Sequence, residues 1–313
     1  MEKKYDVLAI GELNVDLILT GLATLPIPGR EIIADNCALT MGSSTAICAA
    51  GIAKLGLKTG FVGKVGDDSY GRVASDALRG YGVDLQNLIV DPSIDTGITV
   101  SMTARNNSDR ALLTYLGSID SLKAEEVSDD ILAQTKHIHV GSFFLQSKLR
   151  PGLADMFARA KKFGVTTSLD AGWDDTGCWD YGILDVLKHT DVFLPNESEA
   201  LNITGKTDVA EAAKQLSTYC KICAVKCGAD GAAVACGGEV RSFATYKATP
   251  VDTTGAGDSF NAGFIYGFVN GLDIEGSAQM GNACGSVSIT RYGGASSCAS
   301  LDDARGVILN GKV

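Results

Sequence analysis

The sequence predicts an α/β fold with a mainly parallel central sheet, helices on both of its faces and a small additional sheet. Short apolar runs alternate with helical patterns along most of the 313 residues, as in strands joined by crossover helices. Residues 31–40 and 96–116 break that rhythm, because they are rich in β-branched residues that alternate with polar ones. No linker or internal repeat divides the chain, so we expect one domain over residues 1–313.

The elements of the main sheet are identified by their length and period. Short apolar runs predict strands at residues 7–10, 60–65, 137–140, 165–169, 192–194, 222–226 and 232–235. Apolar residues at helical spacing predict helices at residues 44–55, 71–81, 151–163, 181–188, 209–218 and 258–270. In a sheet of this kind, ligands bind at the carboxyl ends of the strands.

The two irregular stretches predict a small antiparallel sheet. Between residues 98 and 103, apolar side chains fall on one face and Thr99, Ser101 and Thr103 on the other. Residues 105–110 have the composition of a hairpin turn. Such a sheet serves as a lid over a site or as an oligomer surface, and either use explains an exposed apolar face. We expect lid segments at about 29–42 and 96–118, and a homodimer formed through the lid.

Composition narrows the functional classes. A formal net charge of −10 argues against nucleic acids and anionic membranes as partners. The first apolar run is too short for export or for a membrane span, so we expect a cytoplasmic protein. Most of the nine cysteines sit in apolar segments typical of buried thiols. Neither the cluster of Cys220, Cys223 and Cys227 nor the pair of His137 and His139 has the further ligands that a metal site requires.

Residues 251–260 carry the strongest chemical signal. Gly255, Ala256 and Gly257 have no bulky side chain, so their N–H groups can approach an anion closely. The apolar helix that follows adds unpaired N–H groups and the positive end of its dipole. Asp258, at the start of this helix, has the position of a general base that accepts a proton beside a bound phosphate. An ordinary helix cap is the alternative interpretation, and composition alone does not decide between the two.

Other nucleotide-binding motifs are not supported. Gly205-Lys206-Thr207 lacks the earlier glycine of a Walker-type phosphate loop, and the segment before it is helical. No glycine fingerprint of a dinucleotide-binding fold follows the first strand.

Residues 251–260 resemble the second signature of the ribokinase-like carbohydrate kinases, the PfkB family. The resemblance covers nearly the whole chain and extends to residues 10–16, 42–71, 194–199, 227–231, 282–284 and 291–295. It implies a ribokinase-like three-layer sandwich with a central mainly parallel sheet and a small β-sheet lid. It also implies that the protein phosphorylates a sugar with ATP and Mg²⁺.

The resemblance assigns the catalytic and sugar-binding roles. It implies that Asp258 is the catalytic base and that the amides of Gly255, Ala256 and Gly257 form an anion hole. It places the sugar at Asn14, Asp16, Gly42 and Ser43. A local lysine or arginine is the alternative partner for Asp16, which follows a buried strand where an unpaired carboxylate is costly.

The resemblance also assigns the nucleotide and metal roles. It places the nucleotide at Asn196, Lys226, Gly228, Gly231 and Asn282. Glu199 and Asn196 are expected to hold Mg²⁺ through water, as carboxylate and amide oxygens suit this ion. The same two residues have the spacing of a helix capping box, and both roles can hold at once. Asp252 is expected to bind a monovalent cation, with K⁺ as the candidate.

Four elements depart from the family pattern, the first being Ser43, which stands where the family has the second glycine of a Gly-Gly pair. Ile47 stands where the family has an asparagine that contacts a sugar hydroxyl, and its side chain forms no hydrogen bond. The family's Asp-Pro-Asn element is changed to Asp170-Ala171-Gly172-Trp173, whose tryptophan either stacks on a ligand ring or packs. Lys226 stands where threonine is frequent, and it can meet an ATP phosphate.

The sequence thus predicts an ATP-dependent kinase that acts on a primary hydroxyl of a sugar or sugar-like compound. A nucleoside kinase of the same family is an alternative, since Ile47 and Trp173 alter the sugar and ring contacts. A binding protein that has lost catalysis is the other, and the intact Gly255-Ala256-Gly257-Asp258 motif argues against it.

Overall fold

The computed structural model describes residues 3–105 and 110–313, and within these ranges it contains a nine-stranded main sheet. In spatial order the strands are β13 (Glu239–Phe243), β12 (Ala232–Cys236), β11 (Ile222–Lys226), β10 (Val192–Phe193), β9 (Thr166–Leu169), β8 (Thr135–Val140), β1 (Tyr5–Ile10), β4 (Thr59–Gly66) and β5 (Asp84–Asp91). The strands from β11 to β5 are parallel, and β12 and β13 extend the sheet in antiparallel fashion.

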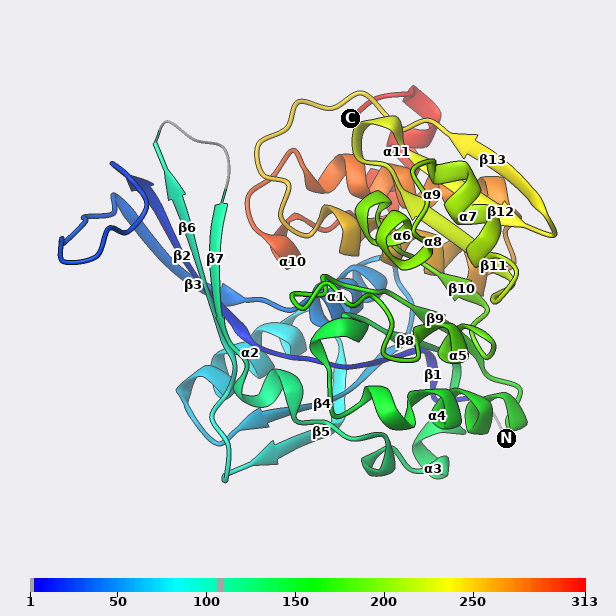
Figure 1. Ribbon diagram of the computed structural model, residues 1–313, viewed down its shortest axis with the longest axis horizontal. Coiled ribbons are helices and arrows are strands. Elements are labelled where there is room, and N and C mark those ends of the chain that lie inside the picture. Colours follow the sequence, from blue (N-terminus) through cyan, green and yellow to red (C-terminus); the bar gives the residue numbers. More distant parts are fainter. Residues whose placement is uncertain (1–2, 106–109) are drawn as a thin grey trace.

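Helices cover both faces of this sheet, as Figure 1 shows. One face packs against α3 (Asp129–Leu132), α4 (Arg150–Lys162), α5 (Ile183–Leu187), α6 (Glu197–Thr204) and α7 (Val209–Leu216). The other packs against α1 (Ser44–Lys54), α2 (Ser69–Gly80), α8 (Ala256–Val269), α9 (Ile274–Ser288) and α11 (Leu301–Asn310). The short α10 (Gly294–Ser297) contacts α1. Alternate strand residues therefore enter different cores: Leu8 lies in the first, Val7 and Ala9 in the second. The three-layer α/β architecture is confirmed.

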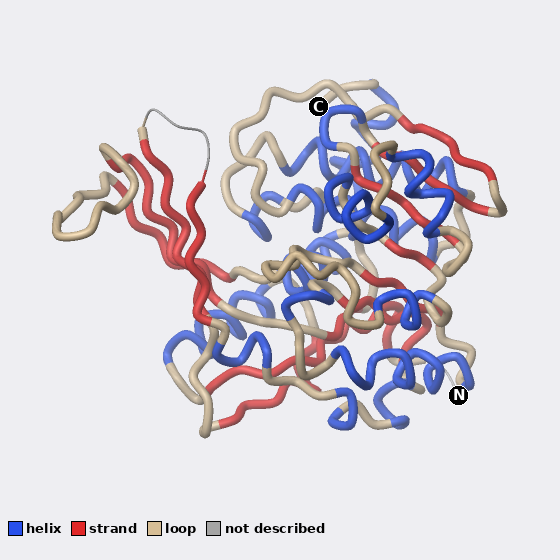
Figure 2. The backbone as a smooth tube through the Cα atoms, viewed as in Figure 1, coloured by secondary structure: helices blue, strands red, loops and turns tan. Residues whose placement is uncertain are grey.

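A second sheet stands apart from the layered body (Figure 2). Its described strands are ordered β3 (Asn36–Met41), β2 (Val15–Leu22), β6 (Ile98–Ala104) and β7 (Arg110–Tyr115). The expectation of a purely antiparallel sheet is wrong, because β2 and β6 pair in parallel. The strand β2 was not anticipated, although it lies between the two expected segments in the sheet. The hairpin turn predicted at 105–110 falls largely on residues 106–109, which lie outside the described residues.

The small sheet has two chemically different faces. Side chains on its inner face line a cavity, and six of them carry hydroxyl groups: Thr20, Thr40, Thr99, Ser101, Thr103 and Thr114. Alternate residues point the other way, so the outer face presents Leu17, Leu19, Leu39, Val100, Met102, Leu113 and Tyr115. Leu113 is 65% exposed and Tyr115 54% exposed. The outer face is therefore an apolar surface in this single chain.

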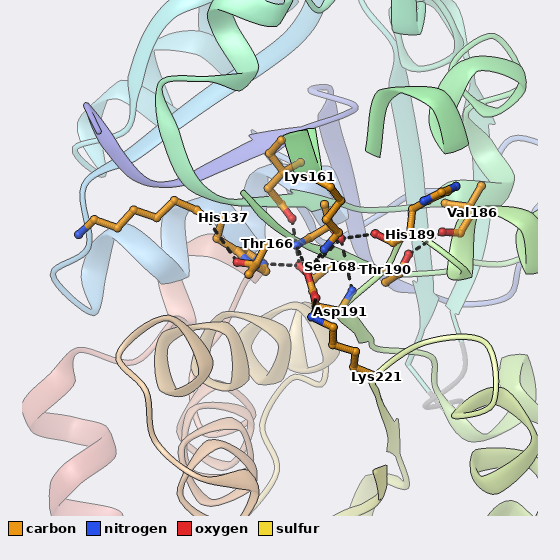
Figure 3. A network of polar contacts seen from close by, with 12 residues as sticks. His137, Lys161, Thr166, Ser168, Val186, His189, Thr190, Asp191 and Lys221 are labelled. Carbon is orange, nitrogen blue, oxygen red and sulfur yellow. Dashed lines mark hydrogen bonds and ion pairs between the residues drawn. The ribbon is translucent and has the colours of Figure 1, made fainter. Parts of the chain in front are cut away.

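A network of polar side chains lies at the amino-terminal ends of the central strands of the main sheet (Figure 3). Asp191, which is 1% exposed, precedes β10 and pairs with Lys161 and with Lys221, whose Nζ lies 2.6 Å from Asp191 Oδ1. The Thr167 amide also donates to Asp191 Oδ2, at 2.8 Å. Burial favours the neutral acid, but the two lysines hold the pKa of Asp191 below its usual range.

Two further expectations concern the chain as a whole. The nine cysteines, which all lie in the described ranges, are free thiols. None of the helices in those ranges combines the length and the apolar character that a membrane span needs.

Candidate active site

Two adjoining cavities open at the carboxyl ends of the parallel strands. The larger has a volume of about 980 Å³ and lies between the inner face of the small sheet, the start of α1 and the loop that precedes α8. The smaller has a volume of about 380 Å³ and is lined by the ends of β9, β10 and β11. Asp258 lines both cavities, together with Ser44, Ser142 and Leu145. The site predicted from residues 251–260 is thus a junction between two spaces.

Asp258 does not cap α8. The N-cap is Gly255, whose φ of 73° is left-handed, and Asp258 occupies the third helical position. Its Oδ1 instead accepts a hydrogen bond from Ser44 Oγ at the start of α1. Burial raises the pKa of Asp258 to about 7, and the negative charge of Asp170 acts in the same direction. The capping interpretation is therefore wrong, and Asp258 is a carboxyl group poised to change protonation near neutral pH.

The predicted anion hole lies in the first turn of α8. N–H groups in the first turn of a helix have no partner within the helix. Gly257 lines the smaller cavity and Gly255 the larger. Ala256 lines neither, and its N–H donates to Thr253 O at 3.3 Å. Two of the three predicted donor residues, Gly255 and Gly257, therefore line opposite sides of the junction, and Ala256 does not.

The smaller cavity contains a capping box that also faces a ligand space. Asn196 Oδ1 accepts from the Glu199 amide at 2.9 Å, and Glu199 Oε2 accepts from the Asn196 amide at 2.8 Å. Both residues line the cavity, so the capping box leaves them at its wall. Burial, followed by the charge of Asp170, raises the pKa of Glu199 to about 7.

The donor set fits Mg²⁺ that is held largely by other ligands. Among the described residues no group of three or more His, Cys, Asp or Glu side chains is placed to hold a metal ion. Mg²⁺ needs no such cage, because it keeps several waters and binds substrate phosphates. Glu199, Asp170 and Asp258 nevertheless bring three carboxylates to one cavity with one ammonium group, that of Lys226. A divalent cation in this space would offset that excess of negative charge.

Three of the predicted sugar-binding residues, Asn14, Asp16 and Ser43, line the larger cavity. Asn14 Nδ2 donates to Val15 O at 3.1 Å and to Asp16 Oδ1 at 3.3 Å, which orients the carboxylate. Gly42 lies against the same group, since a Cβ on it would meet Asp16 Oδ1 at 2.0 Å. Ser43 lines the cavity, but its hydroxyl caps α1 by accepting from the Ala46 amide at 3.2 Å.

Ile47 reaches this cavity as an apolar wall. Its Cδ1 would lie 2.5 Å from a Cβ placed on Gly294, so the isoleucine packs directly on the backbone of α10. The side chain thus ties α1 to α10 where the family pattern has an amide. The Ile47 side chain offers no hydrogen bond to a ligand in this cavity.

Sequence reasoning missed Glu12 as a site residue. Glu12 is 3% exposed, lines the larger cavity, and accepts hydrogen bonds from Thr45 Oγ1 at 2.5 Å and from Ser142 Oγ at 2.9 Å. Burial raises the pKa of Glu12. Its position directly after the buried strand β1, in the same motif as Asn14 and Asp16, was the available signal.

Two of the five predicted nucleotide-binding residues line neither cavity. Gly228 lines the smaller cavity, but Gly231 and Asn282 line neither. Asn282 Nδ2 donates to Phe243 O at 3.0 Å and to Ala244 O at 3.1 Å, so it holds the chain that follows β13. Gly231 has a φ of 89° and packs against the same segment.

Asp252 lies in the larger cavity and organises the loop before α8. Its Oδ1 accepts from the Thr254 amide at 2.9 Å, and its Oδ2 accepts from the Gly293 amide at 3.0 Å. These bonds join the loop of residues 250–255 to the segment before α10.

Comparisons with known proteins concern the family and the fold of the chain. The family described as pfkB family carbohydrate kinase matches residues 4–301. The 5-dehydro-2-deoxygluconokinase of Lacticaseibacillus casei is 29% identical over 96% of this chain and 95% of its own length. A putative ribokinase II from E. coli, solved in complex with ATP and Mg²⁺, is 24% identical with a TM-score of 0.86 over 99% of this chain and 100% of its own, which shows the fold. The adenosine kinase of Sinorhizobium meliloti is 26% identical with a TM-score of 0.81, over 98% of this chain and 99% of its own. The chain belongs to the pfkB family of carbohydrate kinases.

Proposed function

We propose that the protein transfers the γ-phosphoryl group of ATP to a primary hydroxyl of a sugar or sugar-like compound. The observation that supports this most directly is the position of Asp258 at the junction of the two cavities. The acceptor would occupy the larger cavity and the phosphates of ATP the smaller. Only at the junction do both substrates meet a single general base.

The chemistry would proceed with few protein groups. Asp258 accepts the proton of the attacking hydroxyl, for which a pKa of about 7 is well matched to neutral pH. The amides of Gly255 and Gly257 face the developing negative charge on the transferring group. Mg²⁺, when bound beside Glu199 and Asn196, supplies further charge neutralisation. The small sheet, acting as a lid, would exclude water that could otherwise accept the phosphoryl group.

The lining of the larger cavity favours an uncharged acceptor. The charged side chains that line it within the described residues are the carboxylates Glu12, Asp16, Asp252 and Asp258. These groups accept hydrogen bonds from sugar hydroxyls but repel a carboxylate or a phosphate. Hydroxyl groups of the inner sheet face supply both donors and acceptors. On the charge of this lining we favour a neutral sugar over a sugar phosphate or a sugar acid, although the name of the Lacticaseibacillus relative points to a sugar acid.

A nucleoside remains the second candidate because of the cavity's size. About 980 Å³ lies at the upper end of the range for small-molecule sites. Ile47, Leu145 and Tyr292 give part of its wall an apolar character that suits a ring system. The name of the Sinorhizobium relative points to the same substrate class.

A panel assay separates these possibilities. ADP release would be measured with neutral sugars, sugar acids, sugar phosphates and nucleosides, each with ATP and Mg²⁺. We expect the highest kcat/KM with a neutral sugar. The highest kcat/KM with a nucleoside would replace the sugar assignment. Tight binding of one compound without turnover on any would instead indicate a binding protein without catalysis.

Two further parts of the proposal concern K⁺ and assembly. Asp252 and the carbonyl groups of its loop suit a monovalent cation, so KCl should raise kcat more than NaCl does at equal ionic strength.

The apolar outer face of the small sheet would bind the same face of a second copy. Leu113→Asp should then convert a dimer to a monomer in light scattering, whereas Lys214→Asp, on α7, should not.

A further inference from the structure

Three polar side chains form a closed ring beside the smaller cavity, which two of them, Asp170 and Lys226, line. Lys226 Nζ donates to Asp170 Oδ2 at 2.6 Å and to Asn261 Oδ1 at 3.2 Å. Asn261 Nδ2 donates to the same Asp170 Oδ2 at 2.7 Å. The three residues come from the ends of β9 and β11 and from α8. Each of the three contacts is therefore supported by the other two.

The ring fixes one ammonium group beside the anion hole. A Cβ placed on Gly257 would lie 3.6 Å from Lys226 Nζ. Lys226 lines the smaller cavity, and its side chain is only 13% exposed. An ammonium group has three donors, and the ring accounts for two of them. The third N–H group of the Lys226 ammonium can donate to an oxygen atom of a ligand that binds in the cavity.

The ring also decides which carboxylate Lys226 pairs with. Asp170, Glu199 and Asp258 all line the same cavity as this lysine. Burial alone would raise the pKa of Asp170, but the charge of Lys226 lowers it, so this partner stays ionised. A lysine paired with Asp258 would instead hold the base ionised and weakly basic. Asn261 helps to prevent this by tying Lys226 and Asp170 together.

We propose that Lys226 binds the phosphoryl group that is transferred, and that Asp170 and Asn261 are positioning residues that hold its ammonium beside Gly257 and away from Asp258. This inference rests on the proposed function. The acceptor hydroxyl gives its proton to Asp258 as its oxygen bonds to the γ-phosphorus. The bond from that phosphorus to the bridging oxygen breaks, and its electron pair leaves with ADP. Lys226 keeps its proton throughout and makes no covalent bond.

The first test compares ATP with ADP. Lys226→Met should weaken ATP binding about tenfold to hundredfold, the size of one charge-assisted hydrogen bond, and leave ADP binding within about twofold. The readout is intrinsic fluorescence without acceptor, since the chain has two tryptophans and Trp173 lines this cavity. The control is Lys221→Met, whose lysine side chain is 76% exposed. Equal losses for ATP and ADP would overturn the assignment.

A second variant guards against misfolding. Lys226→Met leaves Asp170 buried without its cation, which is destabilising. The double variant Lys226→Met with Asp170→Asn removes both charges and keeps the size of the aspartate. It should fold and show the same selective loss of ATP affinity. Retention of the wild-type ratio of ATP to ADP affinity in this variant would contradict the proposal.

The third test uses the pH dependence of kcat. The charged groups that act on Asp258 are Asp170 and Glu12, which raise its pKa, and Lys226, which lowers it; the Ser44 hydroxyl also lowers it. Asp170→Asn should therefore move the acid limb to lower pH, and Lys226→Met should move it to higher pH. Lys226→Met should also lower kcat by about 10²–10³-fold, as for loss of an anion-hole donor. The shift of the acid limb reports the charges of the ring, whereas the loss of kcat reports contact with the transferred group, so an acid limb that moves in Lys226→Met while kcat stays within threefold would contradict the proposal.

The outcomes separate the inference from the proposed function. If the wild-type protein turns over no acceptor, the proposed function fails, while the comparison of ATP and ADP binding can still be made. If the wild-type protein is active and Lys226→Met keeps kcat within threefold and the ratio of affinities unchanged, the inference alone fails.

Discussion

Two buried aspartates lie at opposite ends of the parallel strands of the main sheet, and both pair with lysine. Asp191 precedes β10 at the amino-terminal end, between Lys161 and Lys221 (Figure 3). Asp170 follows β9 at the carboxyl-terminal end and pairs with Lys226. Burial and pairing are alike in the two places. The surroundings differ. Asp191 has more ammonium groups than carboxylates around it, whereas the cavity around Asp170 and Lys226 has more carboxylates than ammonium groups.

This difference identifies the active site better than burial does. The Asp191 network is compensated within the protein, so its expected role is stability. Burial, together with the charge of Asp170, raises the pKa values of Asp258 and Glu199 to about 7, a sign of negative charge that the protein alone does not compensate. Such a site gains stability when a cation or a positively charged complex binds.

The largest expected effect separates the two networks by activity. Asp258→Asn removes the proposed base and should lower kcat by about 10²–10⁴-fold, with ATP affinity largely retained. Asp191→Asn is the matched control, since it neutralises a buried aspartate at the other end of the strands, and it should keep kcat. The measurement is steady-state ADP release. A kcat for Asp258→Asn close to that of the wild type would contradict the proposed mechanism.

The next effect is on stability, with the opposite sign. The folded pKa of Asp258 is about 7, above the unfolded value of 3.8, so the folded state loses stability as pH rises from about 4 to 7. Asp258→Asn should therefore raise the free energy of unfolding at pH 8 by on the order of 2–4 kcal/mol. The gain should shrink towards pH 4. Urea titrations at both pH values measure it, and a loss of stability at pH 8 would contradict the comparison.

Asp191→Asn should lower the free energy of unfolding by about 1–3 kcal/mol at pH 7. Because the folded pKa of Asp191 is depressed, its contribution is present above the unfolded pKa and is lost as pH falls through the folded value. Urea midpoints at pH 7 and at a pH below the unfolded pKa of 3.8 test this. The same midpoint for variant and wild type at pH 7 would show that the network is not stabilising.

The smallest effect distinguishes the two kinds of lysine. Lys221→Met should change the free energy of unfolding by less than about 1 kcal/mol, because the lysine is exposed and Lys161 remains beside Asp191. Its kcat should match that of the wild type. A loss as large as that of Asp191→Asn would mean that Lys221, rather than Lys161, carries the network.

Much of the site could be predicted because its residues lie in contiguous motifs. Asp258, Asp16 and Asn196 each follow or precede a recognisable apolar segment, and the structure places all three at the cavities or their walls. Asn261 could not be predicted in this way. It lies 91 residues from Asp170 in sequence, and their contact depends on how α8 packs on the sheet.

The fold was predictable where the period was strong. The helix α8 was found, but α9 was missed because it is rich in Gly, Ala and Ser and is buried on several sides between α8 and α11. The edge strands β5 and β13 were missed because half-exposed strands carry mixed polarity. Sequence also does not reveal strand order, so the parallel pairing of β2 with β6 emerged only from the structure.

The alternation of side chains in the small sheet has an evolutionary consequence. Neighbouring positions in one strand, such as Thr99 and Val100, belong to the cavity wall and to the outer face respectively. A substitution at one position can change which acceptor fits while the other continues to serve the outer surface. Selection can therefore diversify substrate preference on one face of the sheet while conserving the other, within the same strands.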